Sequence, residues 1–294
     1  MTTTMPERTS LSMRPGYEGA NIRTWIGFKH FMYLAEAAVL QWFRDRDLGP
    51  HRLLHEHGLG WEVIDSSVQL PAVLEVDDEV RAEVTRIGGR RFSVVLTTER
   101  DGGTVTVLRG KLTVALIPEA IGVATAPVPE AYRELRVASF AEAVTPAPQP
   151  EPGDFRWSWR VPYFYCHFTD RLQHSGYVRA LEEVVDRFLA DRGISVGRLL
   201  AERSWIPVVS RARVRQLAPV HMEETLHTTL TVGDVLRDTM FEARMDCHVL
   251  RDGQPVHTAT ATILHGYAIS AGPQAGSLAN LGEIADVLTG RSGS

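Results

Sequence analysis

An acid and a histidine stand close together in FTDRLQHSGYVRALEE, residues 168–183, where Asp170 is followed four residues later by His174. A carboxylate can act as a general base or nucleophile, and a nearby imidazole can orient it or polarise a carbonyl group. A helical run begins just after the pair, and the unpaired N–H groups at a helix start favour negative charge. We therefore predict Asp170 and His174 as catalytic residues, with N–H groups near Gly176 as an oxyanion site. The alternative is a polar loop in which Asp170 caps a turn and His174 packs.

Two further carboxylates lie in the same helical run and are alternative candidates for the chemistry. These are Glu182 and Glu183. Glu36 occupies the position equivalent to Glu182 in an earlier, related segment, which favours a shared structural role over catalysis.

Cysteine and histidine residues give weaker signals. Cys166 and His167 are neighbours on an expected strand and would point to opposite faces, which favours a structural cysteine over a nucleophile. His51 and His55 have helical spacing, but no third ligand follows at a diagnostic distance, so no metal site is expected. GxGxxG, P-loop and GxSxG patterns are missing from the sequence. No cofactor is therefore predicted.

The chain contains an internal repeat with an offset of about 147 residues. Three pairs of segments correspond in the same order: 43–64 with 189–209, QLPAVLEVDDEV (69–80) with QLAPVHMEETL (216–226), and 96–117 with 247–268. Conserved order over about a hundred residues in each half indicates two copies of one structural unit.

Each copy follows the pattern strand, polar loop, helix and several strands. The helix of the second copy has an apolar face, because Val178, Leu181, Val185 and Phe188 recur at three- and four-residue steps. Asp-Gly turns in ERDGGT (99–104) and RDGQ (251–254) predict antiparallel hairpins in both copies.

The expected division of the chain follows from this pattern. It comprises a disordered tail (1–14), an N-terminal repeat (15–118), a Pro/Ala-rich linker with one short helix (119–155), a C-terminal repeat (156–270) and a C-terminal tail (271–294).

Composition excludes several classes of partner. The net charge of −5 arises from interspersed acids and bases without a basic block, so nucleic acid is not expected to bind. No apolar run approaches the roughly 18 residues of a membrane span. Two cysteines and the absence of a signal-like apolar segment favour a cytoplasmic protein.

The repeat unit resembles the hotdog fold of acyl thioesterases. Two copies in one chain resemble the double-hotdog acyl-ACP and acyl-CoA thioesterases of the 4-hydroxybenzoyl-CoA thioesterase superfamily. The motif that carries this resemblance is Asp170, then Gln173-His174 and Ser175-Gly176-Tyr177 at a helix start. It implies an α+β tandem hotdog in which each repeat is a long helix wrapped by an antiparallel sheet.

The resemblance also implies functional residues. Gln173, Gly176 and Tyr177 would bind substrate or line the oxyanion site. Leu172 stands where acyl-ACP thioesterases have Asn, which removes one side-chain amide from the predicted site.

The first copy lacks the acid. An offset of 146 residues carries Asp170 to Thr24 and His174 to Phe28, so one active site per chain is expected, in the second copy. Aromatic and apolar residues of the first copy are expected to pack in the core or, as the alternative, to line an acyl tunnel: Trp25, Phe28, Phe31, Met32 and Tyr33.

The expected activity is hydrolysis of a fatty or polyketide-type acyl thioester on acyl carrier protein or coenzyme A. Two alternatives stay open: a dehydratase or hydratase acting on 3-hydroxyacyl or enoyl thioesters, and a non-catalytic acyl-binding or scaffold protein of a biosynthetic pathway. Exposed sheet edges are compatible with a homodimer.

Overall fold

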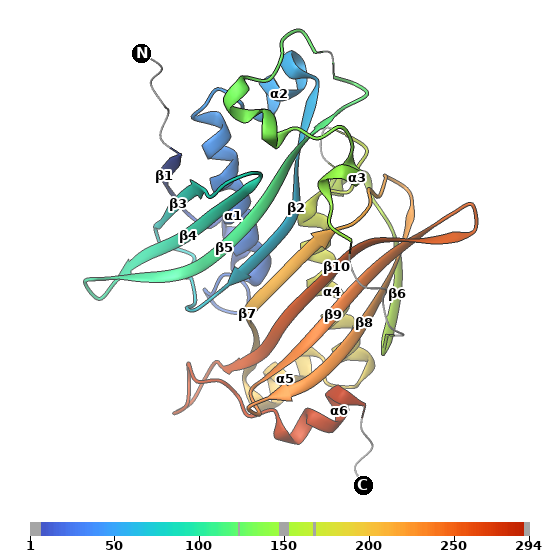
Figure 1. The fold of residues 1–294 in the computed structure, drawn as a ribbon. Helices are drawn as coiled ribbons and strands as arrows, with labels where there is room; N and C mark the ends of the chain where they lie inside the picture. The colour runs from blue at the N-terminus through green and yellow to red at the C-terminus, as the bar shows by residue number, and fades with distance from the viewer. Residues whose placement is uncertain (1–6, 123, 147–152, 167–168, 291–294) are drawn as a thin grey trace.

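The computed structural model describes residues 7–122, 124–146, 153–166 and 169–290. It has two repeats of the same construction joined into one α+β molecule (Figure 1). The elements of the first repeat are β1 (Arg8–Met13), α1 (Phe28–Arg44), α2 (Pro50–His57), β2 (Leu59–Gln69), β3 (Val80–Arg86), β4 (Arg91–Arg100) and β5 (Gly103–Pro118). A 3₁₀ turn, η1 (Tyr17–Gly19), precedes α1.

The second repeat has the same order. Its elements are β6 (Phe155–Arg160), η3 (Tyr163–Tyr165), α4 (His174–Asp191), α5 (Val196–Arg203), β7 (Trp205–Gln216), β8 (Thr225–Leu236), β9 (Met240–Arg251) and β10 (Gln254–Ile269). The two long helices begin 146 residues apart, at Phe28 and His174. The structure therefore has the repeat that the sequence predicts.

The strands of the described residues form one ten-stranded antiparallel sheet with the order β1-β3-β4-β5-β2-β7-β10-β9-β8-β6. β2 and β7 pair at its centre, where Ser67 lies opposite Arg213, so the sheet continues from one repeat into the other. The predicted hairpins are present between β4 and β5 and between β9 and β10. Positive φ angles at Asp101, Gly102, Asp252 and Gly253 are those of the tight turns that Asp-Gly favours.

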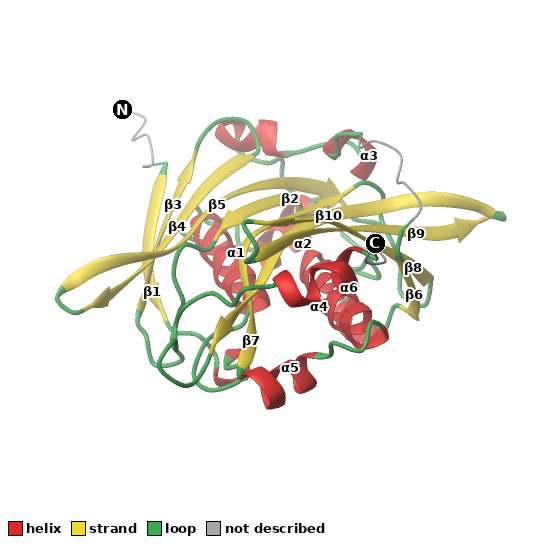
Figure 2. Ribbon diagram, turned by 90° about the horizontal axis from the view of Figure 1, so that it is seen from below, coloured by secondary structure: helices red, strands yellow, loops and turns green. Residues whose placement is uncertain are grey.

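The helices α1 and α4 lie together against one face of this sheet (Figure 2). The predicted apolar face of α4 is buried, including Val178, Leu181, Val185 and Phe188. Arg179 Nε donates to Tyr33 Oη at 2.6 Å, and these residues are themselves 146 positions apart. The contact marks the approximate two-fold axis that relates the repeats.

The connection between the repeats is ordered over much of its length. It contains η2 (Glu130–Leu135) and α3 (Phe140–Ala143). Phe140 packs with Ile64 of β2 and Ile117 of β5 in a small second core. Because neighbouring Val63 and Leu116 belong to the main core, strand alternation puts this second core on the opposite face of the sheet.

Both predicted tails need correction. Residues 8–13 form β1, which pairs with β3, and Trp42 Nε1 donates to the Glu7 carbonyl at 2.8 Å. The C-terminal segment contains η4 (Gly282–Ile284) and α6 (Ala285–Thr289) and buries Leu281 and Leu288 in the main core. Short apolar runs that dock onto a core have no local signal of their own, which is why composition assigned them to tails. No helix among the described residues is long and apolar enough to span a membrane.

Candidate active site

The structure separates the two predicted catalytic residues. Asp170 is exposed and its Oδ2 lies 3.1 Å from His221 Nδ1 on the surface. His174, the first residue of α4, is buried, and its Nε2 lies 2.8 Å from Ser66 Oγ of β2. Its Nδ1 lies 3.6 Å from Glu36 Oε2 of α1. The predicted Asp170–His174 pair therefore does not form.

Arg171, the residue after Asp170, points into the protein interior. Successive residues of this extended segment alternate in direction, so Asp170 points outward and Arg171 points inward. The Arg171 guanidinium pairs with the buried carboxylates of Glu62 and Glu119. Burial raises the pKa of Glu62 to about 7, although the Arg171 charge acts in the opposite direction.

The space around the start of α4 is filled by side chains. A Cβ atom on Gly176 would lie 2.5 Å from Leu172 Cδ1, so Leu172 packs directly against the helix start. The Gly176 N–H donates to the Gln173 carbonyl at 3.0 Å and is not free for an oxyanion. Tyr177 is fully buried, and Gln173 is the helix cap without a side-chain capping bond. The predicted substrate-binding roles of Gln173, Gly176 and Tyr177 therefore lack an accessible site.

Ser66, His174 and Glu36 nevertheless have the residue types of a Ser-His-acid triad. Ser66 has 0% of its surface exposed and His174 4%. The residues that line the large pocket described next include none from 170–177. A substrate carbonyl would have no path to Ser66 in this arrangement, so the trio is best interpreted as packing across the interface between repeats.

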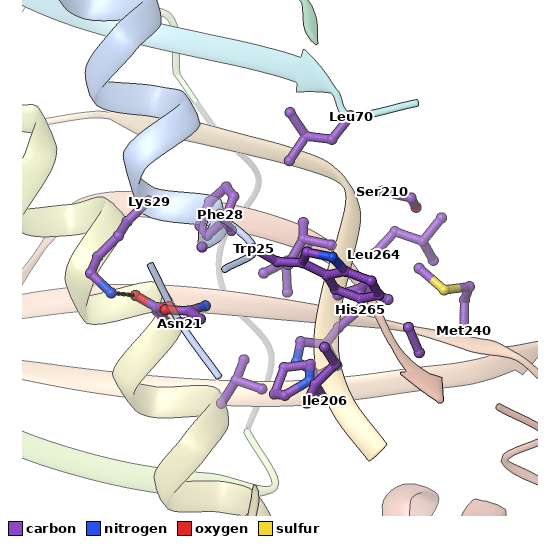
Figure 3. Close-up of a pocket in the computed structure, with 18 of the residues that line it drawn as sticks. Asn21, Trp25, Phe28, Lys29, Leu70, Ile206, Ser210, Met240, Leu264 and His265 are labelled. Carbon is purple, nitrogen blue, oxygen red and sulfur yellow. Dashed lines mark ion pairs between the residues drawn. The ribbon is translucent and has the colours of Figure 1, made fainter. Parts of the chain in front are cut away.

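A pocket of about 1650 Å³ opens at the other, related position, the start of α1 (Figure 3). Both repeats build it: loops 21–27 and 70–73 and the first turn of α1 come from the first, and α4, β7 and β10 from the second. Apolar side chains form much of its wall, among them Trp25, Phe28, Phe31, Ile206, Val208 and Ile263. Trp25, Phe28 and Phe31 therefore line the pocket, as in the tunnel alternative, whereas Met32 is buried in the core.

The start of α1 is open to this pocket. Gly27 caps the helix without a side-chain hydrogen bond, and no described residue accepts from the N–H groups of Phe28 and Lys29. The Asn21 side chain lies against Gly27, since a Cβ atom there would be 2.5 Å from Asn21 Nδ2. Two free N–H groups, the positive end of the helix dipole and an amide together form an arrangement suited to a developing oxyanion.

A carboxylate faces this helix start from the other repeat. Glu182 of α4 lines the pocket, and its Oε2 lies 2.8 Å from Lys29 Nζ, the ion pair drawn in Figure 3. Glu36, which is equivalent to Glu182, likewise faces the start of α4, where its carboxylate lies 3.6 Å from His174 Nδ1. Glu183 also lines the pocket, but its carboxylate pairs with Arg187 one helical turn later, at 2.7 Å. Of the two alternative carboxylates predicted from the sequence, Glu182 is therefore the one that faces a helix start.

Sequence reasoning looked for an acid and a histidine within one copy, whereas the structure brings carboxylates to helix starts from the other repeat. At the start of α1, Glu182 faces the helix across the interface between the repeats. The available signals were the alignment of Glu36 with Glu182 and the presence of Lys29, one of only two lysines in the chain.

The other candidates have structural surroundings. Cys166 is half-buried, with burial raising its thiol pKa, and His167 lies outside the described residues. The rings of His51 and His55 contact each other in a tilted arrangement, with centroids 4.5 Å apart. Within the described ranges, no group of three His, Cys, Asp or Glu residues is arranged to hold a metal ion.

One family model matches part of the chain. Residues 156–272 match the family model of the thioesterase-like superfamily. No match is found among curated protein sequences.

Solved structures resemble the chain over most of its length. A 12:0-ACP thioesterase from Umbellularia californica gives a TM-score of 0.63 at 11% identity, covering 90% of this chain and 99% of that one. A Lactobacillus plantarum protein assigned as an oleoyl thioesterase gives 0.62 at 12% identity, covering 89% and 96%. An acyl-ACP thioesterase from Bacteroides thetaiotaomicron gives 0.54 at 9% identity, covering 88% and 98%.

The structural similarity, at TM-scores of 0.62 and 0.63, confirms the predicted α+β double-hotdog architecture. Residues 156–272 are thus similar to the thioesterase-like superfamily, and the chain has, over about nine-tenths of its length, the double-hotdog fold of these acyl thioesterase structures.

Proposed function

We propose that the protein hydrolyses an acyl thioester, with a fatty or polyketide-type acyl chain on coenzyme A or acyl carrier protein, in the pocket at the start of α1. The observation that carries this proposal is the meeting of a large apolar pocket with an open helix start and a facing carboxylate. The thioesterases among the similar structures support the reaction class.

The proposed chemistry uses groups from both repeats. The thioester carbonyl oxygen accepts hydrogen bonds from the N–H groups of Phe28 and Lys29 and from the Asn21 amide. Glu182 removes a proton from a water molecule as the water oxygen attacks the carbonyl carbon. The helix start stabilises the oxyanion of the tetrahedral intermediate. The carbon–sulfur bond then breaks, and the departing sulfur takes the proton from Glu182, which releases the thiol and the carboxylic acid and restores the carboxylate.

The test is thiol release from a panel of acyl-CoA and acyl-carrier-protein thioesters. Glu182→Gln should lower kcat by about 10²–10⁴-fold, the usual contribution of a general base. Glu183→Gln is the matched control, because it alters the adjacent carboxylate, which pairs with Arg187, and it should keep most of the activity.

Three results would contradict the proposal. Loss of hydrolysis in Ser66→Ala with full activity in Glu182→Gln would move the site to the start of α4. Enoyl absorbance without thiol release would indicate a dehydratase or hydratase. Bound acyl group without turnover in the wild type would indicate an acyl-binding protein.

A further inference from the structure

A buried histidine lines the apolar pocket. His265 of β10 is 5% exposed, and its ring contacts Phe241 and Tyr267, with centroid distances of 5.0 and 5.2 Å. Burial lowers its pKa to about 4, so the imidazole is neutral near pH 7. A phenyl ring would satisfy these neighbours equally well, so aromatic packing alone does not require a histidine here.

The imidazole has no hydrogen-bond partner among the described residues. Its Nδ1 is fully buried and unpaired. Leaving a buried polar group unpaired is unfavourable, and buried imidazoles in folded proteins usually have a partner. The proposed reaction at the start of α1 does not use His265.

The sheet is locally irregular where His265 faces the pocket. The pairing of β10 with β7 shifts register between Leu264 and His265, which leaves Ser210 of β7 as the extra residue. Such bulges redirect side chains. Ser210 and His265 both line the pocket, as Figure 3 shows, so the bulge places two uncharged polar residues on the wall beside the apolar side chains of Val209 and Ile263.

We propose that the acyl chain carries a hydroxyl group that hydrogen-bonds with His265 and Ser210, so that the substrate is a hydroxyacyl thioester and not a plain alkyl one. This inference depends on the proposed thioesterase function of the same pocket. A hydroxyl group both donates and accepts, so it pairs with either tautomer of a neutral imidazole. A small rotation of the ring brings a nitrogen toward such a ligand.

The test compares tetradecanoyl-CoA with its monohydroxylated positional isomers. For the wild type, at least one isomer should have a kcat/KM about tenfold above that of tetradecanoyl-CoA, since an apolar chain leaves the histidine unpaired. His265→Phe should lower the ratio of kcat/KM for that isomer to kcat/KM for tetradecanoyl-CoA by about tenfold. His265→Gln, which keeps a donor and an acceptor, should retain part of the preference, and Ser210→Ala should weaken it.

A direct binding measurement separates this inference from the proposed function. Titration calorimetry with free tetradecanoic acid and its hydroxylated isomers requires no turnover. If no thioester is hydrolysed but the wild type binds one hydroxylated acid more tightly and His265→Phe does not, the thioesterase proposal fails and the histidine's role stands. The inference would be overturned if the preference for the hydroxylated chain over the plain chain, measured as a ratio of kcat/KM values and as a ratio of affinities, were the same in the wild type and in His265→Phe.

Discussion

Gly27 controls how close the Asn21 amide comes to the start of α1. Its backbone angles, φ −69° and ψ 152°, suit any residue, but an added Cβ atom would lie 2.5 Å from Asn21 Nδ2. Gly27→Ala should therefore displace Asn21 and lower kcat for thioester hydrolysis by about 10²-fold, the usual effect of losing one oxyanion donor.

Gly49→Ala provides the matched control for this substitution. Gly49 caps α2 with similar angles, and its added Cβ atom would lie 3.4 Å from Arg44 Cγ. Both variants should lose a similar, small amount of stability, because alanine is a poorer helix cap than glycine. Equal kcat values for the two variants would exclude a role for Asn21 positioning.

Glu62 gives the protein a predictable pH dependence of stability. The buried cluster of Arg171, Glu62 and Glu119 is neutral only when one carboxyl group holds a proton, and the pKa of Glu62 is raised from 4.5 to about 7. Between these pH values the folded protein keeps a proton that the unfolded chain releases. The contribution of Glu62 to stability is thus full below about pH 4.5 and is lost as the pH rises to about 7.

Urea unfolding of the wild type and Glu62→Gln at several pH values measures this contribution. The difference in the free energy of unfolding, wild type minus variant, should fall by about 3 kcal/mol from pH 4.5 to pH 7.5. Parallel pH profiles for the two proteins would show that Glu62 does not take up this proton.

At the scale of elements, β1 completes the edge of the sheet next to α1. It pairs with β3 along its length, and Thr9 Oγ1 donates to Asp45 Oδ2 at 2.8 Å. Deletion of residues 1–13 should lower the free energy of unfolding by about 2–4 kcal/mol, because ladder bonds are lost and the Trp42 indole N–H loses its acceptor, Glu7.

Deletion of residues 1–6 is the control for this experiment, since it leaves Glu7 and β1 in place. Hydrolysis at a temperature where both proteins are folded should be the same, because no residue of β1 lines the pocket. A loss of stability as large in the 1–6 deletion as in the 1–13 deletion would contradict the role given to β1.

At the scale of the whole molecule, the proposed active site exists only when the repeats are joined. Asn21 and Gly27 come from the first repeat, Glu182 from the second, and the central β2–β7 pairing holds them in register. Fragments 1–150 and 151–294 should each be inactive when expressed alone, and coexpression should restore thioester hydrolysis. Hydrolysis by fragment 151–294 alone would contradict a site shared by the two repeats and would favour the site predicted from the sequence, at Asp170 and His174.

The sequence by itself determined the repeat, the type and order of most elements, and the two Asp-Gly hairpins. These features depend on short-range physics: helical periodicity at Val178 and Leu181, strand alternation in 255–268, and the left-handed conformation that Asp252-Gly253 readily adopts. Each of these signals lies within a few residues of the feature that it predicts.

Only the tertiary structure decided which of two related helix starts is open. Ser66 and Glu36 close around His174 at the start of α4, and both lie more than a hundred residues away in the chain. At the start of α1, Glu182 of the second repeat faces the helix, and a pocket lies in front of the helix start. Whether a helix start is filled or open depends on side chains that packing between the repeats brings together. The residues around Asp170 in the sequence do not include those side chains, so the local pattern could not predict that packing.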